Sequence, residues 1–127
     1  MNTGLWVVQV LLALAFGMAG FMKLTQPKEK LKTNMAWVED FAPNTIRMIG
    51  TLELLAAIGL ILPSITLILP VLTPLAAIGL ILTMIGAALT HARRGENQMI
   101  LINLVLLALA AFVAYGRFVL IPLTQVA

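Results

Sequence analysis

The chain has 127 residues, of which 61% are hydrophobic and only 10% are charged. Ordinary soluble domains carry about 25% charged residues, and a soluble domain of this length has too little interior to hide so many apolar side chains. The composition therefore excludes an ordinary soluble domain and predicts one domain that spans a membrane, in which the surplus apolar side chains face lipid.

Four apolar segments predict the fold. A transmembrane helix needs about 20 apolar residues to cross a hydrocarbon layer of about 30 Å, and each segment is close to that length. We therefore expect an all-α protein, a single polytopic membrane domain over residues 1–127 that forms a four-helix transmembrane bundle. The predicted spans cover about residues 5–22, 45–62, 71–90 and 99–121.

The first two spans are joined by the only long polar stretch, residues 23–44. In a helix, Leu31, Met35 and Val38 would share one face, which predicts a short amphipathic helix at the membrane interface. An ordinary solvated loop is the alternative. In the second connection, Pro63 predicts a tight turn, because proline lacks the N–H that a helix interior needs.

The basic residues indicate topology rather than a nucleic-acid partner. The net charge is +3; four lysines lie between residues 23 and 32, and Arg93 and Arg94 lie in the third connection. Four crossings place both connections on one side, which the positive-inside rule assigns to the cytoplasm, with both termini outside. A nucleic-acid module would instead need a basic face on a soluble core, so no nucleic-acid partner is expected.

The chemistry available to one chain is limited. There is no cysteine and only one histidine, His91. This composition excludes disulfides, thiolate nucleophiles, Cys-ligated clusters and paired-histidine metal sites, so we expect no metal and no intrinsic cofactor. No nucleophile–base pair or phosphate-binding glycine loop is visible either. The sequence leaves enzymatic activity open but favours a protein that is not an autonomous enzyme.

Glu53 is the most informative residue, because its carboxylate lies within the second predicted span. A charged acid at the centre of a membrane helix costs about 2.5–3.5 kcal/mol, so such residues usually face the bundle interior and have a partner. Arg47, in the same segment, is the nearest candidate partner. The two are six residues apart, about 9 Å along the axis, so each is also expected to have interhelical partners.

Further polar residues are expected at the same depth in the membrane as Glu53. The first and third spans end on the basic side, and the second and fourth begin there, so polar residues near those ends fall in the same half of the bundle. This argument predicts one polar cluster of five side chains contributed by four helices: Lys23, Arg47, Glu53, His91 and Asn103.

Three functions for such a cluster stay open. The first is structural, in which hydrogen bonds and charge pairs only hold the helices together. The second is a pocket for a small amphiphile such as a quinone, since intramembrane charge usually marks function. The third is proton-coupled transport that uses Glu53. Small residues such as Ala13 and Gly17 predict close helix seams, within the chain or between the copies of a homodimer.

Several motifs recur in the order and spacing of a known family. They are Gly17-Met-Ala-Gly-Phe-Met-Lys-Leu24, Arg47-x-x-Gly50-x-x-Glu53 followed by Pro63, Met84-Ile-Gly-Ala-Ala-Leu-Thr-His91, Asn103 and Arg117. Over nearly the whole chain this pattern resembles the DoxX-like membrane proteins.

The resemblance implies a four-helix bundle in the bacterial cytoplasmic membrane. It also implies that the family's recurrent polar residues correspond here to Lys23, Arg47, Glu53, His91 and Asn103. The family is named after thiosulfate:quinone oxidoreductase subunits, and some members are linked with membrane redox complexes. The expected partners are therefore the lipid bilayer, a quinone or other small amphiphile, and a redox partner subunit.

Overall fold

The computed structural model describes residues 1–33 and 35–122, a part of the chain that contains helices and turns but no strand. The remaining residues of the predicted domain, 34 and 123–127, lie outside it. The long helices are α1 (Asn2–Thr25), α3 (Pro43–Thr66), α4 (Leu72–Arg93) and α5 (Asn97–Tyr115), and α5 continues into the π-helical turn η2 (Gly116–Leu120). The predicted four-helix bundle is confirmed, and each helix extends beyond or close to the limits of its predicted span.

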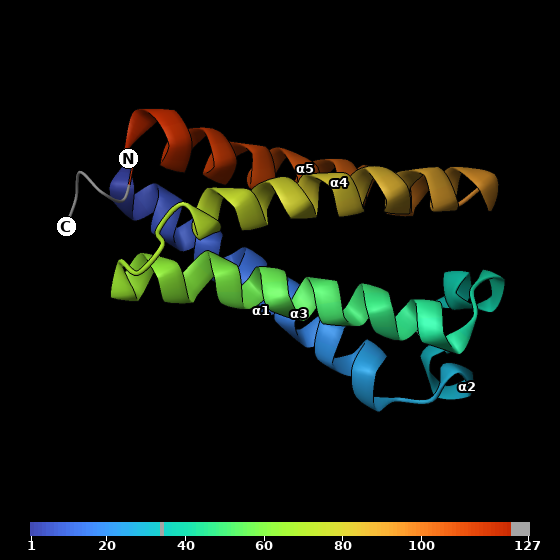
Figure 1. Cartoon of the computed structure of the whole chain (residues 1–127). Helices are drawn as coiled ribbons and strands as arrows, with labels where there is room; N and C mark the ends of the chain where they lie inside the picture. The colour runs from blue at the N-terminus through green and yellow to red at the C-terminus, as the bar shows by residue number, and fades with distance from the viewer. Residues whose placement is uncertain (34, 123–127) are drawn as a thin grey trace.

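The bundle is built from two packed pairs of helices (Figure 1). Helix α1 packs against α3, and α4 packs against α5; α3 also contacts α4, and α1 contacts α5, which closes the bundle. Both basic connections lie at one end, called here the basic end, while the N-terminus and the α3–α4 connection lie at the opposite end. An ion pair of 2.9 Å between Arg94 Nη1 and Asp40 Oδ2 joins the two basic connections.

Helices α1 and α3 approach most closely at two glycines, Gly20 and Gly50. A Cβ atom on Gly20 would lie 2.6 Å from the carbonyl oxygen of Gly50, and a Cβ on Gly50 would lie 2.7 Å from Cβ of Lys23. No larger residue fits at these distances without a shift of the backbone. The contact brings the last turn of α1, which carries Lys23, next to the middle of α3.

The turn predicted at Pro63 is wrong, because α3 continues through this residue to Thr66. A proline inside a helix leaves the carbonyl four residues earlier without its N–H partner. That carbonyl belongs to Gly59, and Thr73 at the start of α4 donates its hydroxyl to it over 2.9 Å. Such replacement of a lost backbone bond by a neighbouring Ser or Thr side chain is what allows proline within membrane helices.

The connection between α1 and α3 forms two short turns, α2 (Lys28–Leu31) and the 3-10 turn η1 (Ala36–Asp40), where one short helix was predicted. Between them Met35 has φ −131° and ψ 76°, which is not a helical conformation. Leu31 and Val38 nevertheless face the same side, as predicted, and are buried against Ile46 of α3. The connection is thereby fixed to the bundle and covers its basic end.

The outer surface of the bundle is apolar. One leucine from each long helix illustrates this: Leu14, Leu55, Leu82 and Leu101 are between 58% and 64% exposed. Soluble monomers rarely expose contiguous apolar patches of more than a few hundred Å². All four helices are also long and apolar enough to cross a membrane. The protein is therefore an integral, multi-pass membrane protein whose exposed leucines face lipid.

Candidate functional site

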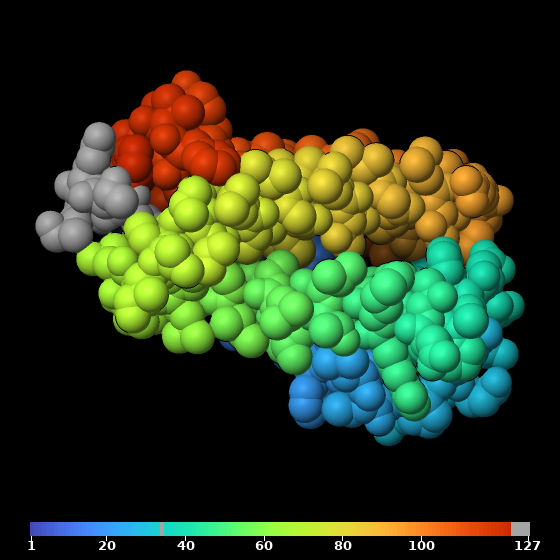
Figure 2. Space-filling view, viewed as in Figure 1, coloured from blue at the N-terminus to red at the C-terminus, as the bar shows by residue number. Residues whose placement is uncertain are grey.

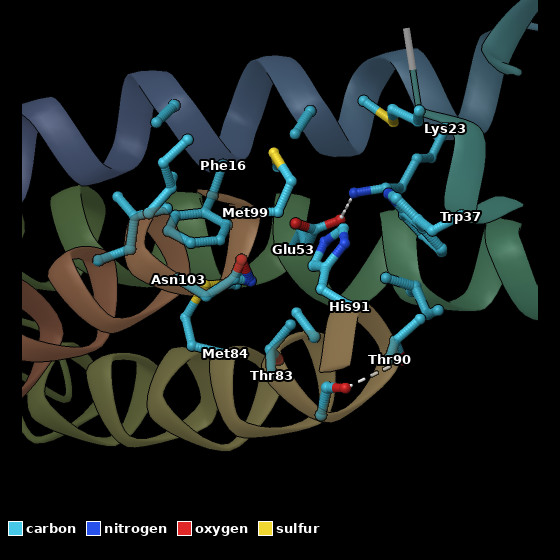
Figure 3. A pocket seen from close by; sticks show the side chains of 18 of the residues that line it. Phe16, Lys23, Trp37, Glu53, Thr83, Met84, Thr90, His91, Met99 and Asn103 are labelled. Atoms are coloured by element: carbon cyan, nitrogen blue, oxygen red, sulfur yellow. Dashed lines mark hydrogen bonds and ion pairs between the residues drawn. The ribbon is translucent and has the colours of Figure 1, made fainter. Parts of the chain in front are cut away.

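A buried ion pair joins α1 to α3 near the basic end. Lys23 Nζ donates to Oε1 of Glu53, and the two side chains are only 6% and 4% exposed. Figure 3 shows the lysine side chain extending from α1 toward the carboxylate on α3. The prediction that Glu53 has an interhelical partner is therefore confirmed, and that partner is Lys23.

Arg47, the nearest candidate partner in the sequence, does not reach this site. Its side chain is exposed and does not line the cavity described below. Six residues of α-helix place Arg47 about 120° away from Glu53 around the helix axis. The buried stripe of α3 begins instead at Ile46, one residue earlier, and continues through Gly50 to Glu53. The expectation that Arg47 belongs to the polar cluster is wrong for this reason.

Two aromatic residues of the basic connection complete the surroundings of Lys23. The Trp37 ring centroid lies 5.4 Å from Lys23 Nζ, within the range of a cation–π interaction. Phe41 packs edge-on against Trp37, with ring centroids 5.5 Å apart. No periodic pattern relates residue 37 to residue 23, so this contact was not predictable from the helices alone.

His91 is held at the end of α4 by the residues that terminate the helix. Gly95 has φ +71°, a left-handed conformation that glycine adopts freely, and the N–H of Glu96 then donates to the His91 carbonyl over 2.9 Å. This turn brings Oε1 of Glu96 to 2.8 Å from Nδ1 of His91. The hydrogen bond with His91, helped by the nearby Arg94, holds the pKa of Glu96 below its ordinary value of 4.5.

The helices and the connection after α1 line a partly open cavity of about 460 Å³ next to these groups. Binding sites for small molecules typically have volumes of about 300–1,000 Å³, mostly apolar walls and a few polar groups. Four of the five predicted residues line this cavity: Lys23, Glu53, His91 and Asn103. The rest of the wall is mainly apolar and includes Phe16, Met35, Trp37, Phe41, Met84 and Met99.

Three polar groups at the cavity have no partner within residues 1–33 and 35–122. The Asn103 side chain is only 5% exposed and its amide makes no hydrogen bond there. His91 uses Nδ1 for Glu96 and leaves Nε2 free, and Glu53 uses Oε1 for Lys23 and leaves Oε2 free. Figure 3 shows Glu53, His91 and Asn103 around the same space. None of these free atoms is among the fully buried unpartnered atoms of the described residues, so they are accessible from the cavity.

A second polar network lies at the opposite end of the bundle. The sequence motifs included only one of its residues, Arg117. Gln9 is fully buried; its Nε2 donates to the Leu60 carbonyl over 2.7 Å and to Ser64 over 3.0 Å, and its Oε1 accepts from Arg117 Nε over 2.7 Å. Ser64 in turn lies 2.8 Å from the Thr73 hydroxyl. Gln9, Ser64, Thr73 and Arg117 thus link all four membrane-spanning segments. The polar groups here bond to one another, except that Arg117 Nη2 is buried without a hydrogen-bond partner among the described residues.

The fold and the site define a small four-helix membrane protein with a ligand-sized cavity near one end. The chain belongs to the DoxX-like family, whose sequence model matches residues 7–113 and therefore covers all four helices. This match confirms the family that the motifs indicated. No curated protein and no solved structure matches the chain.

Proposed function

We propose that this protein binds a quinone-like or other small amphiphilic molecule in the cavity, and that it acts as an accessory subunit of a membrane redox complex. The observation that carries the proposal is the buried Asn103 amide, which faces the cavity with no hydrogen-bond partner in the described part of the chain. If the polar residues served only to hold helices together, this amide would be expected to bond to a neighbouring helix.

The polar groups suit a flat ring with hydrogen-bonding substituents. The Asn103 amide and the Lys23 ammonium can donate to a carbonyl oxygen, and Nε2 of His91 can donate or accept according to its tautomer. The aromatic and methionine side chains of the wall suit the ring itself. The chain has no cysteine, so thiol chemistry in such a complex would have to come from a partner subunit.

Ligand binding to a variant of Asn103 tests the proposal. With the protein in lipid nanodiscs, Asn103→Leu should weaken binding of a benzoquinone about tenfold, since it removes one or two hydrogen bonds in a buried site. Its stability should not fall, because the amide has no internal partner to lose. Asn97→Leu makes the same substitution at an exposed position of the same helix and should change neither property.

The other functions predict different results. A purely structural role predicts that Asn103→Leu loses stability and that wild-type protein binds no quinone. Transport predicts Glu53-dependent flux into liposomes driven by a pH gradient. Sustained flux of that kind would contradict an accessory role.

We further propose that the protein lies in the bacterial cytoplasmic membrane with its basic end in the cytoplasm, as the positive-inside rule favours. The chain has no cysteine, so single cysteines can be introduced for labelling. Lys30→Cys at the basic end should be protected from an impermeant reagent added to intact cells, whereas Ile68→Cys in the α3–α4 connection should react. The reverse pattern would overturn the orientation.

A further inference from the structure

A second cavity, of about 550 Å³, lies along the seam between α3 and α4. It shares Leu52 and Thr83 as lining residues with the first cavity, so the two are adjacent. Its walls include Leu55 and Leu82, which are 58% and 64% exposed on the lipid-facing surface. We call this second cavity the seam groove. Figure 2 shows the molecule hollowed between α3 and α4 on the side in view.

The glycines of this seam differ in what surrounds them. A Cβ on Gly59 would lie 3.0 Å from Cβ of Ala76, so the helices touch there. Cβ atoms on Gly79 and Gly86 would meet nothing within 4 Å. As small residues within a membrane span, these two glycines would be expected to pack helices together. Instead the seam is closed at Gly59 and opens toward the basic end, where Gly79 lines the groove and Gly86 lines the cavity.

At the basic end, the connection between α1 and α3 covers the cavity. Trp37 of η1 and Phe41, the residue after η1, line it on the basic side. Beyond them the 2.9 Å ion pair between Asp40 and Arg94 joins η1 to the α4–α5 connection. The lipid-facing seam is therefore the less obstructed route between the cavity and the surroundings.

We propose that the ligand carries a single long apolar chain, that it reaches the cavity sideways from the bilayer between α3 and α4, and that its chain lies in the seam groove. The proposal rests on the proposed function, because it assumes that a polar head occupies the cavity. Between Thr83 and Ala76, where the helices touch, the groove follows α4 for about 10 Å of helix, which is long enough for an extended chain of several methylene groups. The chain would fill space between exposed leucines that annular lipid otherwise occupies.

Two benzoquinones with the same ring, one bearing a methyl group and the other a decyl chain, test the inference. Binding can be followed in nanodiscs by quenching of Trp37 fluorescence in a Trp6→Phe background, since these are the two tryptophans of the chain. Gly79→Leu fills the groove without meeting another atom at its Cβ. Gly4→Leu, near the start of α1, is the matched control, because a Cβ on Gly4 also meets nothing within 4 Å and Gly4 does not line the groove.

We expect Gly79→Leu to weaken binding of the decyl quinone about tenfold, the cost of one displaced chain segment, while the methyl quinone binds as before. Gly4→Leu should leave both affinities unchanged, and both variants should unfold at the wild-type temperature. Partition of the decyl chain into the bilayer is common to all variants and cancels in the comparison. If the decyl quinone bound wild type and Gly79→Leu with equal affinity, the proposal that its chain lies in the seam groove would be wrong. Binding of the methyl quinone would still support a ligand in the cavity. Failure of both quinones to quench Trp37 in wild type would overturn the cavity and the groove together.

Discussion

Gly20 of α1 and Gly50 of α3 lie against each other's backbone, and this contact determines where Lys23 lies relative to Glu53. The Gly20 and Gly50 positions leave no room for a Cβ atom, since either one would approach backbone or Cβ atoms to 2.6–2.7 Å. Lys23 and Glu53 are each three residues beyond one of these glycines, on the same faces of their helices. The site's only buried ion pair in the described part of the chain thus depends on two residues without side chains.

Gly50→Ala should therefore destabilise the protein by about 1–3 kcal/mol, the usual cost of overpacking a tight contact. It should also weaken quinone binding, because separation of α1 from α3 moves Lys23 away from Glu53. Unfolding in mixed detergent micelles measures the first effect and Trp37 quenching the second. Gly79→Ala is the control, since its Cβ meets nothing within 4 Å and a helix favours alanine over glycine. An equally stable Gly50→Ala protein would contradict the close contact.

The ion pair itself gives a second prediction. Lys23→Met should cost about 3 kcal/mol or more, because it leaves the Glu53 carboxylate buried without a counter-charge. The double variant Lys23→Met/Glu53→Leu should recover most of this loss, since an apolar pair of similar volume is often as stable as a buried ion pair. The same micelle unfolding assay measures both. A double variant less stable than Lys23→Met alone would show that each residue contributes independently.

Much of this site could be predicted from the sequence, and the reason is the regular rise of the α-helix. Depth along each span placed Lys23, Glu53, His91 and Asn103 in the same half of the bundle, and all four line one cavity. Arg47 was misplaced because rise fixes depth but not rotation. Ile46, one residue earlier, begins the buried stripe of α3, and an apolar residue at that position indicates that Arg47 faces away from the bundle interior.

The rest depended on contacts between segments that no periodicity relates. Trp37 meets Lys23 only because the connection after α1 folds back over the basic end. Pro63 was expected to end its helix, and the Thr73 hydroxyl that stabilises the helix there belongs to α4. The seam groove was likewise hidden, because Gly59, Gly79 and Gly86 look equivalent in the sequence yet only Gly59 packs against a neighbouring helix.

Thr73→Val gives a third prediction about that helix. The substitution keeps the shape of the side chain but removes the hydroxyl that donates to Gly59 and contacts Ser64. It should destabilise the protein by about 1–2 kcal/mol, near the upper limit for interhelical hydrogen bonds in membranes. The micelle unfolding assay measures it.

Thr51→Val is the control for this change. The Thr51 hydroxyl bonds the Arg47 carbonyl of its own helix, which a regular helical N–H already satisfies. Its loss should have little effect. If both valine variants were equally stable, the Gly59 carbonyl would not depend on Thr73.

The dependence of the unfolding temperature on pH in acid gives the fourth prediction. The pKa of Glu96 is lowered from 4.5, chiefly by its hydrogen bond with His91 and also by Arg94. A carboxyl whose pKa is lower in the folded protein than in the unfolded chain stabilises the fold above its unfolded pKa, and this contribution disappears as the pH falls through the folded pKa. Wild type should therefore unfold at a higher temperature than Glu96→Gln at pH 6, and the difference should shrink toward pH 3. Asp40 and Glu39, which also lie near Arg94, are present in both proteins, so their contributions cancel in the comparison. Glu29→Gln, which removes an exposed carboxylate 3.4 Å from Lys32, should behave as wild type throughout. A difference that grows in acid would mean that Glu96 does not stabilise the end of α4 through its charge.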